Sequence, residues 1–308
     1  MLTTLRGARC VITGGAGFVG SHLVDRLLNE GARVVVYDNF ISGKRELLPS
    51  GAEVVEGDIR DVKKLLEAIQ GAQVVFHLAA LASVQDSIER PEEYHDVLCS
   101  GTFAVLEAAR KVVSRPRVIV TSSAAVYGDQ NIVCVHEGLF PKPKSPYAQN
   151  KFFSEEMAKL SSELYGVEAI SIRPFNIYGA RMNPDGPYSG VIGRFMKMRK
   201  EGGPLLVTGD GTQTRDFVHV RDIVAAYVAA ALSNSVGEGE VINIASGTSV
   251  TLNELAEIIG GDVTYIPARI ELKDSKADIT RARELLSWTP RVSLEDGIAE
   301  LKTEWGIV

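Results

Sequence analysis

The first 180 residues alternate short apolar runs with longer amphipathic segments. The short runs predict β-strands at residues 9–13, 33–38, 53–56, 73–78, 117–121 and 168–173. Several of these runs are apolar and β-branched throughout, which is typical of strands covered on both faces. The longer segments predict helices at residues 17–30, 61–70, 91–113 and 146–165. This alternation predicts an α/β fold with a doubly wound parallel sheet.

The pattern changes after Asn176, where glycine, proline and tyrosine concentrate in residues 179–190. We therefore expect a first domain at residues 1–175 and a smaller C-terminal α/β domain at residues 176–308, although the segment near residues 215–245 can return to the main sheet. In this half the pattern predicts helices at residues 221–232 and 252–259, a strand at 241–244, and one or two short helices within 280–306.

Composition narrows the classes of function. The 308 residues are 45% hydrophobic, and 33 Lys and Arg against 39 Asp and Glu give a net charge of −6, which argues against a nucleic-acid partner. Cys10, Cys99 and Cys134 are too few and too scattered for a disulfide framework or a zinc site, so we expect no metal. No apolar stretch approaches the ~18 residues that cross a bilayer. We expect no membrane partner and a cytoplasmic location.

Three glycines, Gly14, Gly17 and Gly20, follow the first predicted strand and open the first predicted helix. Glycine lets the backbone approach a pyrophosphate, and the N–H groups of the helix start then face the phosphates. Asp38 ends the second strand, 18 residues after Gly20, where a carboxylate can accept hydrogen bonds from ribose hydroxyls. Because a carboxylate repels a 2′-phosphate, the pattern predicts NAD rather than NADP as cofactor.

Two other polar residues lie near strand ends in this half. Asp58 follows the third strand and can either reach the adenine of a dinucleotide or form a simple turn. His77 lies in an apolar run, and we expect it to be a hydrogen-bonded core histidine rather than a catalyst.

Tyr147 and Lys151 are four residues apart on a helix predicted to begin near Pro146, so their side chains share one face. A tyrosine in water titrates near pH ~10. A neighbouring ammonium, helped by a positive nicotinamide ring, is expected to lower the pKa of Tyr147 toward the range of a general base. Ser122 and Ser123 follow the fifth strand at its carboxyl end, where open α/β sheets bind ligands. One of these hydroxyls can hydrogen-bond the reacting oxygen.

These motifs resemble the extended short-chain dehydrogenase/reductase family, and within it the nucleotide-sugar 4-epimerases of the UDP-glucose 4-epimerase type. The resemblance runs nearly end to end and is carried by residues 13–21, 38–39, 57–58, 77–80, 122–128, 147–151, 173–176 and 215–222. It implies a Rossmann-type sheet with a smaller substrate-binding domain and a homodimer. It also implies that Ser123 is the catalytic hydroxyl, Tyr147 the base and Lys151 its partner. The implied NAD-binding residues are Gly14, Gly17, Phe18, Val19, Gly20, Asp38, Asn39, Asp58, Ile59, Leu78, Ala79, Ala80, Tyr147, Lys151 and Pro174.

The same resemblance implies a UDP-sugar as substrate, with Ser123 and Tyr147 at the sugar and Asn176 and Arg215 at the diphosphate. A guanidinium suits phosphate oxygens, but Arg215 can equally form a salt bridge with one of the aspartates at 216 and 222. Asn176 follows a strand, and its amide can serve as a phosphate donor or as part of a turn.

Residues 269–275 are the part of the resemblance that concerns the far end of the substrate. Arg269 is expected to approach the diphosphate, and Glu271 and Asp274 compete for the role of the acid at the uridine ribose. Ser275 falls near a position that borders the sugar in this family, where a bulky aromatic residue crowds out an N-acetyl group. Serine is small, so we expect UDP-N-acetylhexosamines to be able to enter.

The function expected from this resemblance is NAD-dependent interconversion of UDP-galactose and UDP-glucose by oxidation at C4, rotation of the 4-keto intermediate and reduction. A UDP-N-acetylhexosamine or UDP-glucuronate epimerase is the nearest alternative. Nucleotide-sugar dehydratases and decarboxylases need extra acid or base groups where Ala124 and Ala125 stand, so both are disfavoured. An NADPH-dependent reductase and a non-catalytic NAD-binding protein are minor alternatives.

Two departures from the family's usual pattern are visible. Residues 97–100 read Val-Leu-Cys-Ser where the family often has an asparagine, which makes a side-chain amide in a proton relay doubtful. Gln149 and Asn150 replace the usual small residues between Tyr147 and Lys151. Neither change removes a reacting group.

Overall fold

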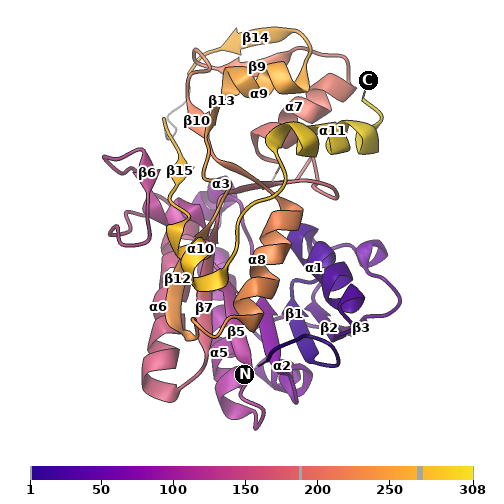
Figure 1. Ribbon diagram of the computed structural model, residues 1–308, viewed down its shortest axis with the longest axis vertical. Helices are drawn as coiled ribbons and strands as arrows, with labels where there is room; N and C mark the ends of the chain where they lie inside the picture. The colour runs from indigo at the N-terminus through magenta and orange to yellow at the C-terminus, as the bar shows by residue number, and fades with distance from the viewer. Residues whose placement is uncertain (1, 187–188, 269–272, 308) are drawn as a thin grey trace.

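A seven-stranded parallel sheet forms the centre of the molecule (Figure 1). The structure, a computed structural model, describes residues 2–186, 189–268 and 273–307. The strand order is β12-β7-β5-β4-β1-β2-β3, and every neighbouring pair runs parallel. The strands are β1 (Arg9–Thr13), β2 (Arg33–Asp38), β3 (Glu53–Glu56), β4 (Val74–His77), β5 (Arg117–Thr121), β7 (Ala169–Pro174) and β12 (Glu238–Ile244). The predicted α/β class with a Rossmann-type sheet is confirmed.

Successive residues of each central strand face opposite layers of helices. Val11 packs with one group of buried side chains and Ile12 with another, on the two sides of the sheet. One layer contains α1 (Phe18–Asn29) and α8 (Val220–Leu232), which contact each other. The other contains α2 (Val62–Ile69), α5 (Gly101–Lys111) and α6 (Pro146–Tyr165). This double coverage explains why the strands are apolar throughout rather than alternating.

The ends of α6 follow from local chemistry. The Ser145 hydroxyl accepts a hydrogen bond from the Ala148 N–H, and Pro146 occupies the first turn, where its missing N–H costs nothing. Gly166 ends the helix in the left-handed conformation with φ of 66°. The cap and the proline place Tyr147 in the first turn of α6, at the carboxyl edge of the sheet.

The helix predicted at residues 91–113 is interrupted in its middle. It consists of α4 (Pro91–His95), a π-helical turn η2 (Asp96–Ser100) and α5. The Leu98 carbonyl accepts hydrogen bonds from the hydroxyls of Thr102, at 2.6 Å, and Ser154, at 3.2 Å. Side-chain hydroxyls that enter the backbone ladder in this way are a known cause of such irregular turns.

The elements above the carboxyl edge of the sheet pack around a core of their own. They include α7 (Gly190–Lys200), α9 (Leu252–Ile259), α11 (Leu294–Trp305) and the parallel pair β9 (Leu205–Thr208) and β14 (Val263–Ile266). In Figure 1 they lie at the top of the molecule, with the sheet below. The pattern of the sequence predicted α9 but missed α7, β9 and β14. The division of the chain into domains at residue 175 stays a prediction.

Shorter elements complete the described chain. Three two-stranded pairs join β8 (Asn176–Tyr178) to β11 (Phe217–His219), β10 (Thr214–Arg215) to β13 (Val250–Thr251), and β6 (Cys134–Val135) to β15 (Lys276–Ala277). The remaining helices are α3 (Val84–Glu89), α10 (Thr280–Leu286) and the 3₁₀ turns η1 (Arg45–Leu47) and η3 (Ala124–Tyr127). Within the ranges described, none of the helices has the length and apolar character needed to span a membrane.

Candidate active site

A cleft of about 980 Å³ opens between the carboxyl edge of the sheet and the elements above it. This is the edge where open α/β sheets bind ligands. All fifteen residues predicted to bind NAD line the cleft, as do the predicted substrate residues Ser123, Asn176 and Arg215. The tertiary structure therefore brings together residues that lie as far apart in the sequence as Gly14 and Arg215.

The glycine loop between β1 and α1 leaves the space that a dinucleotide needs. Gly14 has a φ of 72°, and a Cβ there would lie 2.6 Å from the Ala79 nitrogen. A Cβ at Gly20 would lie 2.2 Å from the Gly14 carbonyl oxygen, so only glycine allows α1 to pack this closely against the loop. Gly17 caps α1 without a side-chain hydrogen bond, which leaves the first N–H groups of the helix directed at the cleft.

Asp38 is buried at the end of β2, beside this loop. Its carboxylate accepts hydrogen bonds from the Ala16 N–H at 2.9 Å and the Phe40 N–H at 2.8 Å. These two bonds hold the carboxylate at the wall of the cleft and leave it lone pairs for further donors. The position and chemistry fit the ribose of NAD, as the sequence predicts.

Asp58, like Asp38, lines the cleft, and the Asp58 carboxylate is already engaged by neighbouring side chains. Arg60 contacts both of its oxygens at 2.8 Å, and these bonds hold the pKa of Asp58 down at about 2. Arg60 also contacts Asp96 at 2.7 Å, and Asn39 donates to Asp58 at 3.2 Å. Arg60 lines the cleft and was missed from the sequence, since an exposed arginine near a strand end carries no distinctive pattern.

His77 is a core histidine, as expected. Its two ring nitrogens contact the hydroxyls of Thr13, at 2.8 Å, and Thr102, at 3.0 Å. Burial lowers the pKa of His77 to about 3, and the charge of Lys151 adds to this effect. A neutral, doubly hydrogen-bonded imidazole inside the sheet is not available for proton transfer to a ligand in the cleft.

Tyr147, Lys151 and Ser123 meet where β5 ends. The Ser123 side chain lies close enough to Tyr147 to lower the pKa of the tyrosine, and the ammonium of Lys151 donates to the Thr121 carbonyl oxygen at 2.7 Å. Ser123 itself caps the short turn η3 by accepting from the Ala125 N–H. A phenol, a hydroxyl and an ammonium thus converge at one point of the cleft wall.

The expectation that Lys151 lowers the pKa of Tyr147 is wrong for the protein alone. Burial raises the pKa of Tyr147 above its ordinary value, and the neighbouring Ser123 hydroxyl offsets this only in part. Burial also lowers the pKa of Lys151 to about 8. The reason is that both side chains are largely buried in the wall of the cleft, so that desolvation outweighs the effects of their neighbours.

Asn176 and Arg215 reach the cleft from the elements above the sheet. The Asn176 amide donates to the Asp216 carbonyl oxygen at 2.8 Å, and an Arg215 Nη donates to the Thr214 carbonyl oxygen at 2.7 Å. The Asp216 carboxylate accepts from the N–H groups of Ser246, Gly247 and Ala277 instead of pairing with Arg215. Asp216 is therefore not a salt-bridge partner of Arg215.

The last group of predicted substrate residues is only partly described. Arg269 and Glu271 lie outside the described residues. Asp274 accepts a hydrogen bond from the Thr214 hydroxyl at 3.1 Å and is absent from the described residues that line the cleft, whereas Ser275 is among them. The acid at the uridine ribose stays a prediction.

Several lining residues come from elements that the sequence pattern did not identify. Phe195 of α7, Leu206 and Thr208 of β9 and Ile266 of β14 form an apolar part of the wall. Tyr227 of α8 also lines the cleft, and its hydroxyl lies 2.6 Å from that of Thr121. Nothing in their local sequence distinguishes these side chains from ordinary core residues. In the described ranges, no group of three or more His, Cys, Asp or Glu side chains could hold a metal ion.

The fold and the cleft define a Rossmann-type protein with a ligand-sized cleft at the carboxyl edge of its sheet. Residues 10–245 match the model of the NAD dependent epimerase/dehydratase family. The chain belongs to this family, and its cofactor is NAD.

Two curated relatives span the chain. A UDP-glucose 4-epimerase of Mycolicibacterium smegmatis is 38% identical over 306 residues, which cover 95% of this chain and 96% of that protein. A UDP-N-acetyl-alpha-D-glucosaminuronate decarboxylase of Bacillus cytotoxicus is 36% identical over 313 residues, which cover 95% of this chain and 96% of that protein.

Solved structures are similar over the same span. The UDP-glucose 4-epimerase of Thermotoga maritima with UDP-glucose has a TM-score of 0.90 and 34% identity, with 97% of this chain and 98% of that chain covered. A UDP-N-acetylglucosamine 4-epimerase of Methanobrevibacter ruminantium has a TM-score of 0.90 at 33% identity, with 97% and 99% covered. A UDP-glucuronic acid 4-epimerase of Bacillus cereus, with UDP-glucuronic acid and NAD, has a TM-score of 0.85 at 32% identity, again with 97% and 99% covered. The chain is therefore an enzyme of the UDP-sugar epimerase and decarboxylase family.

Proposed function

We propose that the protein is a UDP-glucose 4-epimerase that interconverts UDP-galactose and UDP-glucose. The observation that carries the proposal is the meeting of Tyr147, Ser123 and Lys151 in the same cleft as Asn176 and Arg215. The first three groups suit reversible oxidation of a secondary alcohol. The Asn176 amide and the Arg215 guanidinium are hydrogen-bond donors of the kind that suits a diphosphate.

In this proposal Tyr147 accepts the proton of the sugar C4 hydroxyl and later returns it. Ser123, which lies beside Tyr147, orients that hydroxyl. NAD, when bound there, would supply the hydride acceptor and donor for C4. Lys151 would supply a positive charge near the reacting oxygen while its ammonium donates to the Thr121 carbonyl. Residues Gly14, Gly17 and Asp38 would hold the cofactor, and Asn176 and Arg215 would hold the diphosphate while the 4-keto sugar turns.

The two alanines after Ser123 favour epimerisation over elimination or decarboxylation. Ala124 and Ala125 form the start of η3 and line the cleft. The methyl groups of these alanines cannot transfer protons. The side chains at this part of the cleft therefore favour oxidation and reduction at one carbon.

Epimerisation of UDP-N-acetylhexosamines is the second candidate. Ser275 lines the cleft, and a side chain as small as serine would leave space for an N-acetyl group if the sugar binds beside it. We propose that these sugars are accepted along with UDP-galactose, and that pocket shape decides their relative rates.

We also propose a homodimer that buries one face of the pair α5 and α6. Large apolar side chains are exposed there, namely Phe103, Phe153, Leu160 and Leu164. Exposed apolar clusters of this kind are typical of protein interfaces. Light scattering of the purified protein tests the expected mass of two chains.

The function is tested by kcat/KM for UDP-galactose, UDP-glucose, UDP-N-acetylglucosamine and UDP-glucuronate, with products separated by chromatography. Formation of UDP-glucose from UDP-galactose without release of NADH supports the proposal. Stoichiometric NADH release would contradict it, and a preference for UDP-glucuronate would replace the proposed substrate. Failure of the N-acetyl sugar alone would remove only the second candidate.

A further inference from the structure

A buried ion pair lies directly behind the residues that meet at the end of β5. Glu155 is on α6, one turn after Lys151, and Arg173 is on β7. The Arg173 Nε and Nη2 atoms lie 2.7 Å and 2.6 Å from the two carboxylate oxygens of Glu155. The Glu155 side chain is 1% exposed and the Arg173 side chain 3%. Burying such a pair costs about as much as its attraction returns, so stability alone is a weak reason for its presence.

The carboxylate of Glu155 has a third partner on the strand-end turn. The Ser122 hydroxyl donates to the same carboxylate oxygen that the Arg173 Nε contacts. The preceding residue, Thr121, is held by the ammonium of Lys151. Two side chains on one face of α6 therefore fix the two residues that immediately precede Ser123.

The other side of Ser123 leads to the same ion pair. Ser123 caps η3, and the last residue of that turn, Tyr127, lies with its ring 4.6 Å from the Arg173 guanidinium carbon. The Tyr127 hydroxyl donates to the Asn243 side chain of β12 at 2.7 Å. A cation stacked on an aromatic ring and a buried hydrogen bond both restrict the position of the ring.

We propose that Glu155 is a positioning residue, which with Arg173 holds both flanks of Ser123 and so fixes the Ser123 hydroxyl against Tyr147. The proposal rests on the proposed function for the role of Ser123, but its structural content is independent of which sugar binds. Glu155 does not line the cleft within the described residues and has no direct part in the chemistry.

The negative charge of Glu155 also affects the pKa of Lys151. Glu155 raises the pKa of Lys151 and so opposes the larger effect of burial. Other titratable groups near Lys151 are Tyr147, one turn earlier on α6, Cys99 of η2 and His77 of β4, and the histidine is neutral. Loss of the Glu155 charge leaves Arg173 as an uncompensated cation nearby, which favours the neutral form of Lys151 further.

The test compares Ser122→Ala and Glu155→Gln with the control Glu168→Gln. Glu168 directly precedes β7 and contacts Arg117, the first residue of β5, at 2.9 Å; neither residue lines the cleft. We expect kcat to fall about 10-fold in Ser122→Ala and about 100-fold in Glu155→Gln, with KM for the UDP-sugar within about threefold, because small displacements of reacting groups act on the transition state. The basic limb of the kcat–pH profile moves to lower pH in Glu155→Gln and stays in place in Glu168→Gln.

Ser122→Ala removes only the hydroxyl that donates to Glu155 and leaves both members of the ion pair in the chain. It therefore tests the positioning role in a variant that is expected to fold. Because Glu155→Gln can misfold, the double variant Glu155→Leu/Arg173→Met replaces the pair by apolar side chains, which proteins often tolerate. It is expected to fold and still lose kcat. Values of kcat within twofold of wild type in folded Ser122→Ala and in the folded double variant would overturn the proposal.

A readout that needs no turnover separates this proposal from the proposed function. In protein labelled with ¹⁵N-serine and ¹³C-lysine, the amide signal of Ser123 and the Cε signal of Lys151 are assigned through Ser123→Ala and Lys151→Met. We expect the Ser123 signal to shift in Ser122→Ala and Glu155→Gln and the Lys151 titration to move down by about one pH unit in Glu155→Gln. Unchanged signals would overturn the positioning role even if the enzyme epimerises. Shifted signals in a protein without epimerase activity would retain it and reject the function.

Discussion

Tyr147 shows how a single residue combines packing and chemistry. Its ring packs with Tyr94 and Leu98 in a small buried cluster, while its hydroxyl contacts Ser123. Because burial raises its pKa, the phenolate is scarce at neutral pH in the protein alone. The positive cofactor and a protonated Lys151 must supply the attraction that makes proton transfer possible.

We expect Tyr147→Phe to lower kcat at least about 100-fold, since it removes the proton acceptor and keeps the ring in its cluster. Its melting temperature should change little because the ring still packs. Steady-state rates with the best UDP-sugar and a thermal melt check both statements. A variant with near wild-type turnover would show that another group takes the proton.

At the scale of elements, the junction of β1 with α1 decides whether the cofactor site forms. The close contact between Gly20 and the Gly14 carbonyl sets the distance between the loop and the helix start. The first residues of α1, whose N–H groups have no side-chain cap, line the cleft beside this contact.

We expect Gly20→Ala to weaken NAD binding at least about 10-fold and to lower stability by about 1–3 kcal/mol, because the added methyl must push α1 away from the loop. Calorimetric titration with NAD and chemical denaturation measure the two effects. The control is Gly71→Ala, at a glycine that has φ of 73° and open space around its Cβ. It carries backbone strain without touching the cofactor loop. Equal NAD affinity in wild type and Gly20→Ala would contradict this account of the junction.

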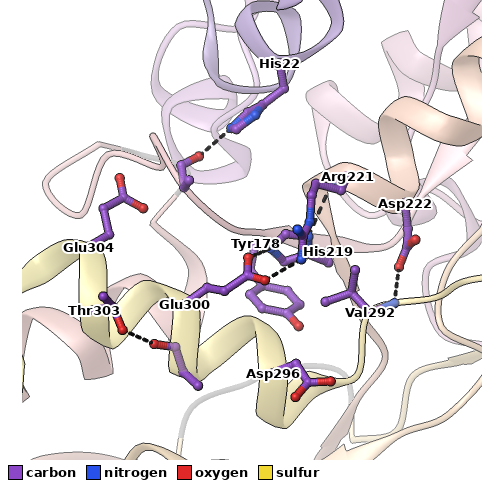
Figure 2. A network of polar contacts seen from close by, with 12 residues as sticks. His22, Tyr178, His219, Arg221, Asp222, Val292, Asp296, Glu300, Thr303 and Glu304 are labelled. Atoms are coloured by element: carbon purple, nitrogen blue, oxygen red, sulfur yellow. Dashed lines mark hydrogen bonds and ion pairs between the residues drawn. The ribbon is translucent and has the colours of Figure 1, made fainter. Parts of the chain in front are cut away.

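At the scale of the whole molecule, the C-terminal helix α11 ties the upper elements to α8 and β11. Figure 2 shows the contacts: the Asp222 carboxylate accepts from the Val292 N–H at 3.0 Å, and Glu300 of α11 contacts both Arg221 and His219. The His219 ring stacks edge-on against Tyr178, and its Nε2 lies 3.7 Å from the Glu300 carboxylate. A buried, neutral histidine therefore lies at the centre of this junction.

This junction predicts acid sensitivity. Burial lowers the pKa of His219 to about 4, with smaller effects from Arg221, Asp222 and His22. A histidine whose pKa is lower in the folded state stabilises the fold fully above its ordinary value of 6.5, and this contribution is lost as the pH falls from 6.5 to about 4. The loss is up to about 3 kcal/mol at 1.4 kcal/mol per unit.

We expect the free energy of unfolding to fall less between pH 7 and pH 5 in His219→Asn than in wild type, because asparagine can still cap α8 but cannot titrate. His77 titrates in the same direction and keeps part of the slope in both proteins. Urea denaturation at pH 5, 6 and 7 measures the difference. Identical slopes would show that His219 does not govern the acid response.

Local patterns in the sequence determined the sheet strands, the glycine loop, Asp38, and the Tyr147 and Lys151 pair. Each of these depends on residues close together in the chain: a buried strand needs a continuous apolar run, and four-residue spacing places two side chains on one helix face. The resemblance to a known family added Asn176 and Arg215, which no local pattern distinguishes from turn or surface residues.

Only the tertiary structure decided what surrounds these residues. The contact of Glu155 with Ser122 and Arg173 joins α6, the end of β5 and β7, and the apolar wall from Leu206 and Ile266 comes from two strands that pair across more than fifty residues. The raised pKa of Tyr147 likewise depends on the burial of its side chain, which its neighbours in the chain do not determine. These features arise from contacts between distant segments, and their energies depend on enclosure and geometry that a one-dimensional pattern does not contain.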